Sequence, residues 1–439
     1  MAPGAALQYS LRPNIAQRPQ PPPAVIPSAS MTSSKPSSRR AFLGAAASAS
    51  IWIPSAVTGY TAREVHAAVE TRKGVSKWDL DTPALCLDLD AMERNVAKMQ
   101  ATLAKNGIAS RPHAKTHKCA AIAKYQLATG SIEICCAKVS EAEAMIAQGV
   151  DRVLMTTSNP TPSKIRRAMK LRKASRHFVQ AVDEAQNARD LSAAAREAGV
   201  VADVVVDVAV GTRTGIAPGD EAVALGRLIE TLPNLKFRGM LSYDGGVQHV
   251  KGFAARKERA LRTIEANAAT CEAMKRAGLN TEIFSGGGTG TYNIMHVVPG
   301  FTDVQVGSYV FMDMQYLQIG GEDGGEIYAD FAPALTVTAT IVNNRFPGVV
   351  TTDAGTKALT LNKPNAGVVG EPGLEHVASS DEFGTIRLQN SARSYKIGDK
   401  VELVAPHCDP VVNLYDQIYA IRRDRVEDVW PVTARGRSQ

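Results

Sequence analysis

The chain has 439 residues, of which 44% are hydrophobic and 21% are charged, as in an ordinary globular protein with a sizeable core. The formal net charge is +7, but no acidic residue precedes Glu64, so much of this excess belongs to the N-terminal region. The chain shows neither zinc-finger spacing nor a basic run with interleaved aromatic residues, so we predict no nucleic-acid partner. The six cysteines show no paired spacing, which argues against a disulfide framework. The length predicts two domains and a tail.

Residues 1–68 are predicted to form a disordered leader, because the region is rich in Pro, Ser and Ala. Arg39 and Arg40 stand before a long uncharged stretch, an arrangement that resembles a twin-arginine export signal. Residues 65–67 are a plausible cleavage site. We therefore expect a periplasmic location, with organelle targeting and a cytoplasmic location as the alternatives. Pro54 and the many small residues around it argue against a stable membrane span.

Residues 84–315 alternate short apolar segments with amphipathic helical patterns. Eight strand–helix units over about 200 residues indicate an α/β fold, an eight-stranded parallel (β/α) barrel of the TIM type. A doubly wound open sheet is the alternative. The eight predicted strands are 110–116, 132–138, 152–157, 177–182, 202–210, 237–243, 281–286 and 303–310.

A C-terminal all-β domain is predicted over residues 331–435, where Pro/Gly-rich turns separate apolar runs and no good helix is expected. We add about residues 70–83 to this domain, because the segment 78–89 is a candidate to pair with it. The predicted strands after residue 331 are 334–342, 348–352, 400–404 and 414–421.

The stretch 111–117 closes the first predicted barrel strand with several basic residues. On an extended chain Arg111, His113 and Lys115 share one face, because side chains alternate with a period of two. Neighbouring positive charge disfavours the protonated form of a lysine, and a neutral amine is a nucleophile toward carbonyl groups. A solvated basic strand end is the alternative.

Other predicted strand ends supply further polar groups, and the chemistry of a β/α barrel lies at these ends. Arg213 follows the fifth strand on a tight loop, Tyr243 ends the sixth, and His249 comes shortly after. The glycine-rich loop 285–292 follows the seventh strand. Its backbone N–H groups and hydroxyls can hold a phosphate, although such a loop can also be only a tight turn. A lysine together with a phosphate cradle suits pyridoxal 5'-phosphate.

A candidate metal site lies in the segment 406–416. His407 and Asp409 are two residues apart and point the same way on an extended chain. An imidazole and a carboxylate suit Mn²⁺ or Mg²⁺, with Zn²⁺ and Co²⁺ as alternatives. Cys408 is expected to pack away from this pair as a small hydrophobic residue.

Four motifs together resemble the D-threonine aldolase / D-serine dehydratase-like family, fold-type III pyridoxal-phosphate enzymes related to alanine racemase. The motifs are 111–118, 285–290, 307–313 and 406–410, and the similarity covers about residues 78–430. The resemblance implies that Lys115 binds the cofactor covalently and that Arg213 neighbours its phenolate oxygen. It also implies that Gln305 stands at the pyridine nitrogen.

The resemblance also implies roles for residues beyond the lysine. His249 corresponds to a proposed base, and His407 and Asp409 match the metal pair. Relatives form dimers, so the resemblance implies a homodimer. The further cofactor contacts that it implies are Tyr243, Thr289, Gly307, Ser308 and Tyr316.

We predict a pyridoxal-phosphate- and metal-dependent carbon–carbon lyase that cleaves a D-3-hydroxy amino acid, such as D-threonine, to glycine and an aldehyde. The metal lowers the pKa of the substrate hydroxyl, and His249 removes its proton. One alternative is a D-serine or 3-hydroxy-D-aspartate dehydratase, whose second metal ligand is typically a cysteine where this chain has Asp409. Another is a non-catalytic pyridoxal-phosphate-binding protein, which needs neither the β domain nor the metal pair.

Overall fold

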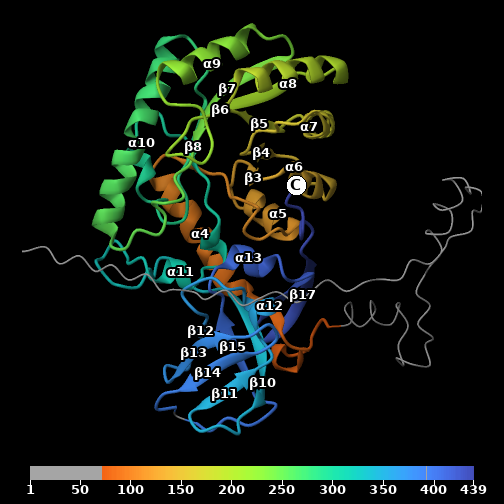
Figure 1. The fold of residues 1–439 in the computed structure, drawn as a ribbon, viewed down its shortest axis with the longest axis vertical. Helices are drawn as coiled ribbons and strands as arrows, with labels where there is room; N and C mark the ends of the chain where they lie inside the picture. The colour runs from red at the N-terminus through yellow and green to blue at the C-terminus, as the bar shows by residue number, and fades with distance from the viewer. Residues whose placement is uncertain (1–71, 392) are drawn as a thin grey trace, which may run out of the picture. The chain divides into compact units, whose positions relative to one another are not determined.

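The computed structural model describes residues 72–391 and 393–439. The predicted leader, with its twin-arginine-like signal, lies outside the described residues. No helix within those ranges is both long and apolar enough to cross a membrane. Two sheets organise the described chain, one with eight strands and one with nine (Figure 1).

The eight-stranded sheet is the predicted barrel, and all its neighbouring strands run parallel. The strand order is β2-β9-β8-β7-β6-β5-β4-β3. A bridge between His113 and Cys135 joins the two outer strands and closes the barrel. The strands are β2 (Ala109–Ser110), β3 (Ile134–Cys136), β4 (Val153–Met155), β5 (Val179–Val182), β6 (Ala202–Asp207), β7 (Leu235–Ser242), β8 (Ile283–Gly286) and β9 (Asp303–Val304).

Helices cover the outside of this barrel (Figure 1). The first begins where the side chain of Asp88 accepts a hydrogen bond from the backbone N–H of Ala91. Its buried face includes Met92, Val96 and Met99, the helical spacing that the sequence shows. The barrel helices are α4 (Leu89–Lys105), α5 (Ala120–Ala128), α6 (Val139–Ala147), α7 (Pro162–Ala174), α8 (Ala185–Ala198), α9 (Asp220–Thr231) and α10 (Phe253–Arg276).

The nine-stranded sheet forms the predicted β domain. Strand β1 precedes the barrel in the sequence, yet it lies between β10 and β16, so the barrel's own elements begin with α4. The nine strands are β1 (Ala84–Asp88), β10 (Leu335–Asn343), β11 (Val349–Thr352), β12 (Gly367–Val368), β13 (Leu374–Ser379), β14 (Gly384–Leu388), β15 (Lys400–Val404), β16 (Gln417–Arg422) and β17 (Arg425–Pro431).

Short helices connect these parts. The expectation of no helix after residue 331 was wrong, because α12 (Thr356–Leu359) and α13 (Cys408–Val412) lie there. Helix α11 (Met314–Leu317) lies between the barrel and the β domain, and one-turn 3₁₀ helices span 77–79, 295–297 and 308–310.

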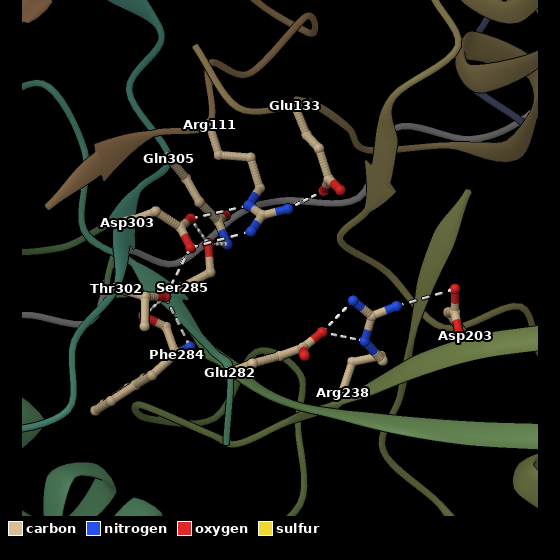
Figure 2. A network of polar contacts seen from close by, with 10 residues as sticks. All are labelled: Arg111, Glu133, Asp203, Arg238, Glu282, Phe284, Ser285, Thr302, Asp303 and Gln305. Atoms are coloured by element: carbon tan, nitrogen blue, oxygen red, sulfur yellow. Dashed lines mark hydrogen bonds and ion pairs between the residues drawn. The ribbon is translucent and has the colours of Figure 1, made fainter. Parts of the chain in front are cut away.

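The first predicted strand, 110–116, is wrong in its extent. Strand β2 ends at Ser110, ahead of a proline that lacks an N–H for sheet pairing. The chain then turns, with the N–H of Thr116 bonded to the carbonyl of His113 at 3.3 Å. Arg111 therefore does not line the cavity together with His113 and Lys115. It is buried in ion pairs with Asp303 and Glu133 (Figure 2).

Asn95 joins helix α4 to the segment that leads into β10. Its side-chain N–H donates to the carbonyl of Ala332, and its carbonyl accepts from the N–H of the same residue, both at 2.8 Å. The Asn95 side chain is buried and Ala332 is partly buried, so water has limited access to these two backbone groups.

We expect Asn95→Ala to lower the free energy of unfolding by about 1–3 kcal/mol, because two partly buried backbone groups lose their partner. Chemical denaturation measures the change. Arg94→Ala, on the exposed side of the same helix, is the control and should change stability by no more than about 0.5 kcal/mol. Equal losses for the two variants would contradict the assignment.

Candidate active site

A cavity lies at the carboxyl ends of the barrel strands, as the fold requires of an active site. It consists of a larger hollow of about 320 Å³ and a smaller hollow of about 80 Å³, and the larger lies within the usual range for ligand sites. The two hollows share four lining residues, namely His113, Lys115, Tyr243 and Gln305.

Every site residue predicted from the sequence lines one of these hollows. Arg213 lines the larger hollow, and the remainder that are not shared line the smaller one: His249, Thr289, Gly307, Ser308, Tyr316, His407 and Asp409. Residues from the barrel and from the β domain thus meet around Lys115. Their individual roles remain predictions.

Lys115 stands in the turn after β2, where the hollows join. Its Nζ lies 5.4 Å from the ring centroid of Tyr243, and the guanidinium carbon of Arg213 lies 5.1 Å from the same centroid. The backbone N–H of Lys115 donates to Nδ1 of His113 at 3.4 Å. Burial, and then the positive charge of Lys115, hold the pKa of His113 well below its ordinary value, so this imidazole is neutral.

The glycine-rich loop forms one wall of the smaller hollow. The Thr289 hydroxyl accepts from the N–H of Tyr309 at 3.1 Å, which leaves its proton free for a ligand oxygen. A Cβ on Gly307 would lie 2.4 Å from Oγ1 of Thr116, so only glycine fits there. Hydroxyls and close-packed backbone at this wall suit a phosphate group.

The metal pair reaches the smaller hollow in a different geometry from the one expected. His407 precedes α13, and Asp409 lies inside that helix, so the two are not on an extended chain. Nδ1 of His407 is 2.8 Å from Oδ2 of Asp313, a fully buried residue. Because Nδ1 faces that carboxylate, Nε2 remains for a metal ion.

The sequence reasoning assigned no role to Asp313, although it lies in the motif 307–313. Its carboxylate also accepts from the N–H groups of Cys408 and Tyr316, both at 3.0 Å. Burial alone would raise the pKa of Asp313, but these bonds and the one with His407 hold it below its ordinary value. An acidic residue directly before a short helix was the available signal.

The ligand atoms of Asp313, His407 and Cys408 all lie within 4.8 Å of one another. Burial raises the pKa of the Cys408 thiol well above its ordinary value, with the charges of Asp313 and Asp409 adding to the effect. The thiol is fully buried, but its sulfur lies 3.5 Å from Oδ1 of Asp409, so Cys408 is not turned away from the metal pair, contrary to the expectation from the sequence.

His249 stands beside the metal pair. Its ring centroid is 4.5 Å from that of Tyr316 and 6.5 Å from that of His407. Burial lowers the pKa of His249, against the opposing charge of Asp313, and therefore favours a neutral imidazole that can accept a proton.

Comparisons with known proteins agree with this geometry. Residues 87–315 match the model of the alanine racemase N-terminal domain, and residues 334–421 match a serine dehydratase domain. A 3-hydroxy-D-aspartate aldolase from Paracoccus denitrificans (strain Pd 1222) is 34% identical over 87% of this chain and 99% of its own length. A D-threonine aldolase from Arthrobacter sp. is 36% identical over 82% of this chain and 94% of its own length.

Solved structures show the same relationship. The D-threonine aldolase from Filomicrobium marinum superposes with a TM-score of 0.80 at 36% identity and covers 84% of this chain and 100% of its own. The D-threo-3-hydroxyaspartate dehydratase from Delftia sp. HT23 superposes with a TM-score of 0.73 at 26% identity and covers 81% of this chain and 98% of its own.

The fold and the cavity define a fold-type III pyridoxal-phosphate enzyme. The chain belongs to the D-threonine aldolase / D-serine dehydratase-like family, and its aldolase relatives make it a carbon–carbon lyase.

Several lining residues were not assigned to the site from the sequence. They are mostly hydroxyl-bearing or charged side chains at strand ends or on the loops that follow, and Thr116 alone among them falls in one of the four motifs: Thr116, Lys138, Thr156, Thr157, Asp207 and Thr214. Asp207 ends β6. Burial raises its pKa to about 6, the Asp183 charge adds to this, and a hydrogen bond from Thr214 opposes it.

We expect Asp207→Asn to raise the free energy of unfolding by about 1–3 kcal/mol at pH 8. The folded-state pKa of Asp207 lies above its unfolded value, so the ionised carboxylate costs stability at pH values above both. At pH 4 the native carboxyl is already protonated, and the gain should disappear. Denaturation at the two pH values measures this, and an equal change at both would contradict it.

Proposed function

We propose that the enzyme cleaves the Cα–Cβ bond of D-3-hydroxy amino acids to give glycine and an aldehyde. The observation that supports this most is the meeting of Lys115, His249 and His407 around one hollow. D-Threonine and 3-hydroxy-D-aspartate are the substrates in the names of its aldolase relatives, and they define the substrate class that we propose.

The residues of the cavity fit pyridoxal 5'-phosphate. Lys115 offers the amine for its aldehyde, while Thr289, Gly307 and Ser308 form a wall suited to its phosphate. Tyr243 and Gln305 line both hollows and would flank the ring. When bound, the cofactor supplies an electron sink for the bond that breaks.

His407 and Asp409 are the proposed ligands of a divalent ion, Mn²⁺ or Mg²⁺, with Zn²⁺ and Co²⁺ as alternatives. Such an ion supplies Lewis-acid chemistry at the substrate hydroxyl. Asp313 holds the imidazole of His407 in position through Nδ1. We assign to His249 the removal of the hydroxyl proton, because its ring centroid lies 6.5 Å from that of His407 and its lowered pKa favours a neutral imidazole.

The metal pair favours cleavage over dehydration. The residue two positions after His407 is Asp409, an oxygen ligand, at the position where the dehydratases typically have a cysteine, and Cys408 stands one position too early. Positions 407 and 409 therefore lack the histidine–cysteine pair that is typical of the dehydratases. A non-catalytic binding protein is disfavoured, because such a role needs neither His249 nor the metal pair.

Incubation of the metal-loaded holoenzyme with D-threonine tests the function. We expect glycine and acetaldehyde in equal amounts, and formation of 2-oxobutyrate and ammonia would instead establish the dehydratase. We also expect a chelator to reduce turnover at least tenfold and added Mn²⁺ to restore it. Asp409→Ala should retain the bound cofactor but lose the response to added metal.

Lys115→Ala should abolish the visible absorbance of the bound cofactor, because no amine remains to link its aldehyde. Lys138→Ala is the matched control, since Lys138 lines the same cavity from an exposed position. This control should keep the visible band, and an unchanged band in Lys115→Ala would refute the assignment of the lysine.

We also propose that the chain forms a homodimer and is exported through the twin-arginine route. Large apolar side chains on the β domain support the first, among them Phe346 at 64% and Leu361 at 80% exposure. The paired arginines of the leader, Arg39 and Arg40, support the second.

A further inference from the structure

A buried chain of hydrogen bonds runs from the cavity into the barrel wall at Gln305 (Figure 2). Nε2 of Gln305 donates to Oγ of Ser285 at 3.1 Å, and Oγ of Ser285 donates to Oδ1 of Asp303 at 2.5 Å. Ser285 and Asp303 are fully buried, whereas Gln305 lines both hollows. One end of this chain therefore faces the cofactor site, and the other is sealed from water.

Asp303 can only accept hydrogen bonds in this position. Its two oxygens receive Nε and Nη2 of Arg111 at 3.0 and 3.2 Å, and the Thr302 hydroxyl at 2.8 Å, in addition to Ser285. A carboxylate paired with a guanidinium and surrounded by four donors has no proton to give.

The proton count determines how the amide of Gln305 is turned. Ser285 has one hydroxyl proton, and it must point to Asp303, because two lone pairs would otherwise face each other at 2.5 Å. Oγ of Ser285 is therefore an acceptor toward Gln305. The end of the Gln305 amide that faces Ser285 must therefore be the NH₂ group. The hydrogen-bond network decides this, because the nitrogen and oxygen of an amide have nearly the same shape.

The carbonyl Oε1 of Gln305 is then available to the cavity. Within residues 72–391 and 393–439 this oxygen has no hydrogen-bond partner. It is also not one of the fully buried polar atoms that lack a partner, so a ligand in the cavity can reach it. A carbonyl can only accept a hydrogen bond. A ring nitrogen that it binds must carry a proton.

We propose that Asp303 and Ser285 are positioning residues that present the Gln305 carbonyl to the pyridine nitrogen of the cofactor and hold that nitrogen protonated. This inference rests on the proposed function, since it requires bound pyridoxal 5'-phosphate. A protonated ring withdraws electrons more strongly than a neutral one, so a neutral glutamine serves here where an acidic partner would otherwise be expected. The charge that supports this state is the buried carboxylate of Asp303, acting through Ser285.

The test uses holoenzyme loaded with pyridoxal 5'-phosphate that carries ¹⁵N in its ring. The ¹⁵N chemical shift distinguishes a protonated from a neutral ring nitrogen without any turnover. We expect the protonated position for the unaltered chain and a shift toward the neutral position for Ser285→Ala, whose Gln305 amide is free to turn.

Two further variants separate positioning from general damage. Thr302→Val removes another donor to Asp303 but touches neither Ser285 nor Gln305, so it should keep the protonated shift. Ser285→Ala combined with Gln305→Glu should restore that shift, because a carboxylate needs no orientation to accept from the ring. Gln305→Met, which keeps the side-chain length but removes the acceptor, should give the neutral shift even if Ser285→Ala does not fold.

A neutral ring nitrogen in the unaltered holoenzyme would overturn the inference and leave the proposed function standing. A protonated nitrogen retained in both Ser285→Ala and Gln305→Met would overturn it as well. Failure of the unaltered chain to bind the labelled cofactor would instead contradict the proposed function itself.

Discussion

The buried ion pair between Arg111 and Asp303 is the interaction on which the rest of the site depends. It joins β2 to β9, the first and last strands of the barrel, directly before the chain turns toward Lys115. Burying two charges costs several kcal/mol, so the pair is retained only because each charge is fully hydrogen-bonded. It secures one arrangement of the strand ends, and through Ser285 it reaches the cavity at Gln305 (Figure 2).

A second buried carboxylate, that of Asp313, positions a residue of the smaller hollow. Asp313 follows the barrel in the sequence and accepts a hydrogen bond from His407. His407 lies between strand β15 and helix α13. The same carboxylate secures the N–H of Tyr316. The metal pair therefore has a defined position relative to Lys115 only when both parts of the described chain are folded together.

These two carboxylates surround a cavity whose own groups differ from wall to wall. One wall offers the hydroxyl of Thr289 and the backbone of Gly307, which suit an anion. The same hollow also offers the imidazoles of His249 and His407. Burial lowers the pKa of His249, whereas the hydrogen bond to Asp313 raises that of His407 against the effect of burial. Lys115 lines this hollow as well, which suits a substrate held by a cofactor on one side and by a metal ion on the other.

Much of this architecture follows from local sequence alone. Eight apolar segments separated by helical periodicity predict the barrel, because each segment must bury both faces of a parallel sheet. The motifs around Lys115, the glycine-rich loop and His407 identify the cofactor and the family, because each motif is a contiguous run of residues that can be recognised without knowing the fold. Four strands of the β domain were not predicted, because they are short or carry several charged and polar residues among the apolar ones, namely β12, β13, β14 and β17.

The polar partnerships within the site were decided only by the tertiary structure. Arg111 and Asp303 are 192 residues apart, and Asp313 and His407 are 94 residues apart. Local periodicity contains no information about which acid meets which base at such separations. Closure of the barrel and docking of the β domain bring these residues together, and burial then gives each pair its strength, because water no longer competes for the same hydrogen bonds.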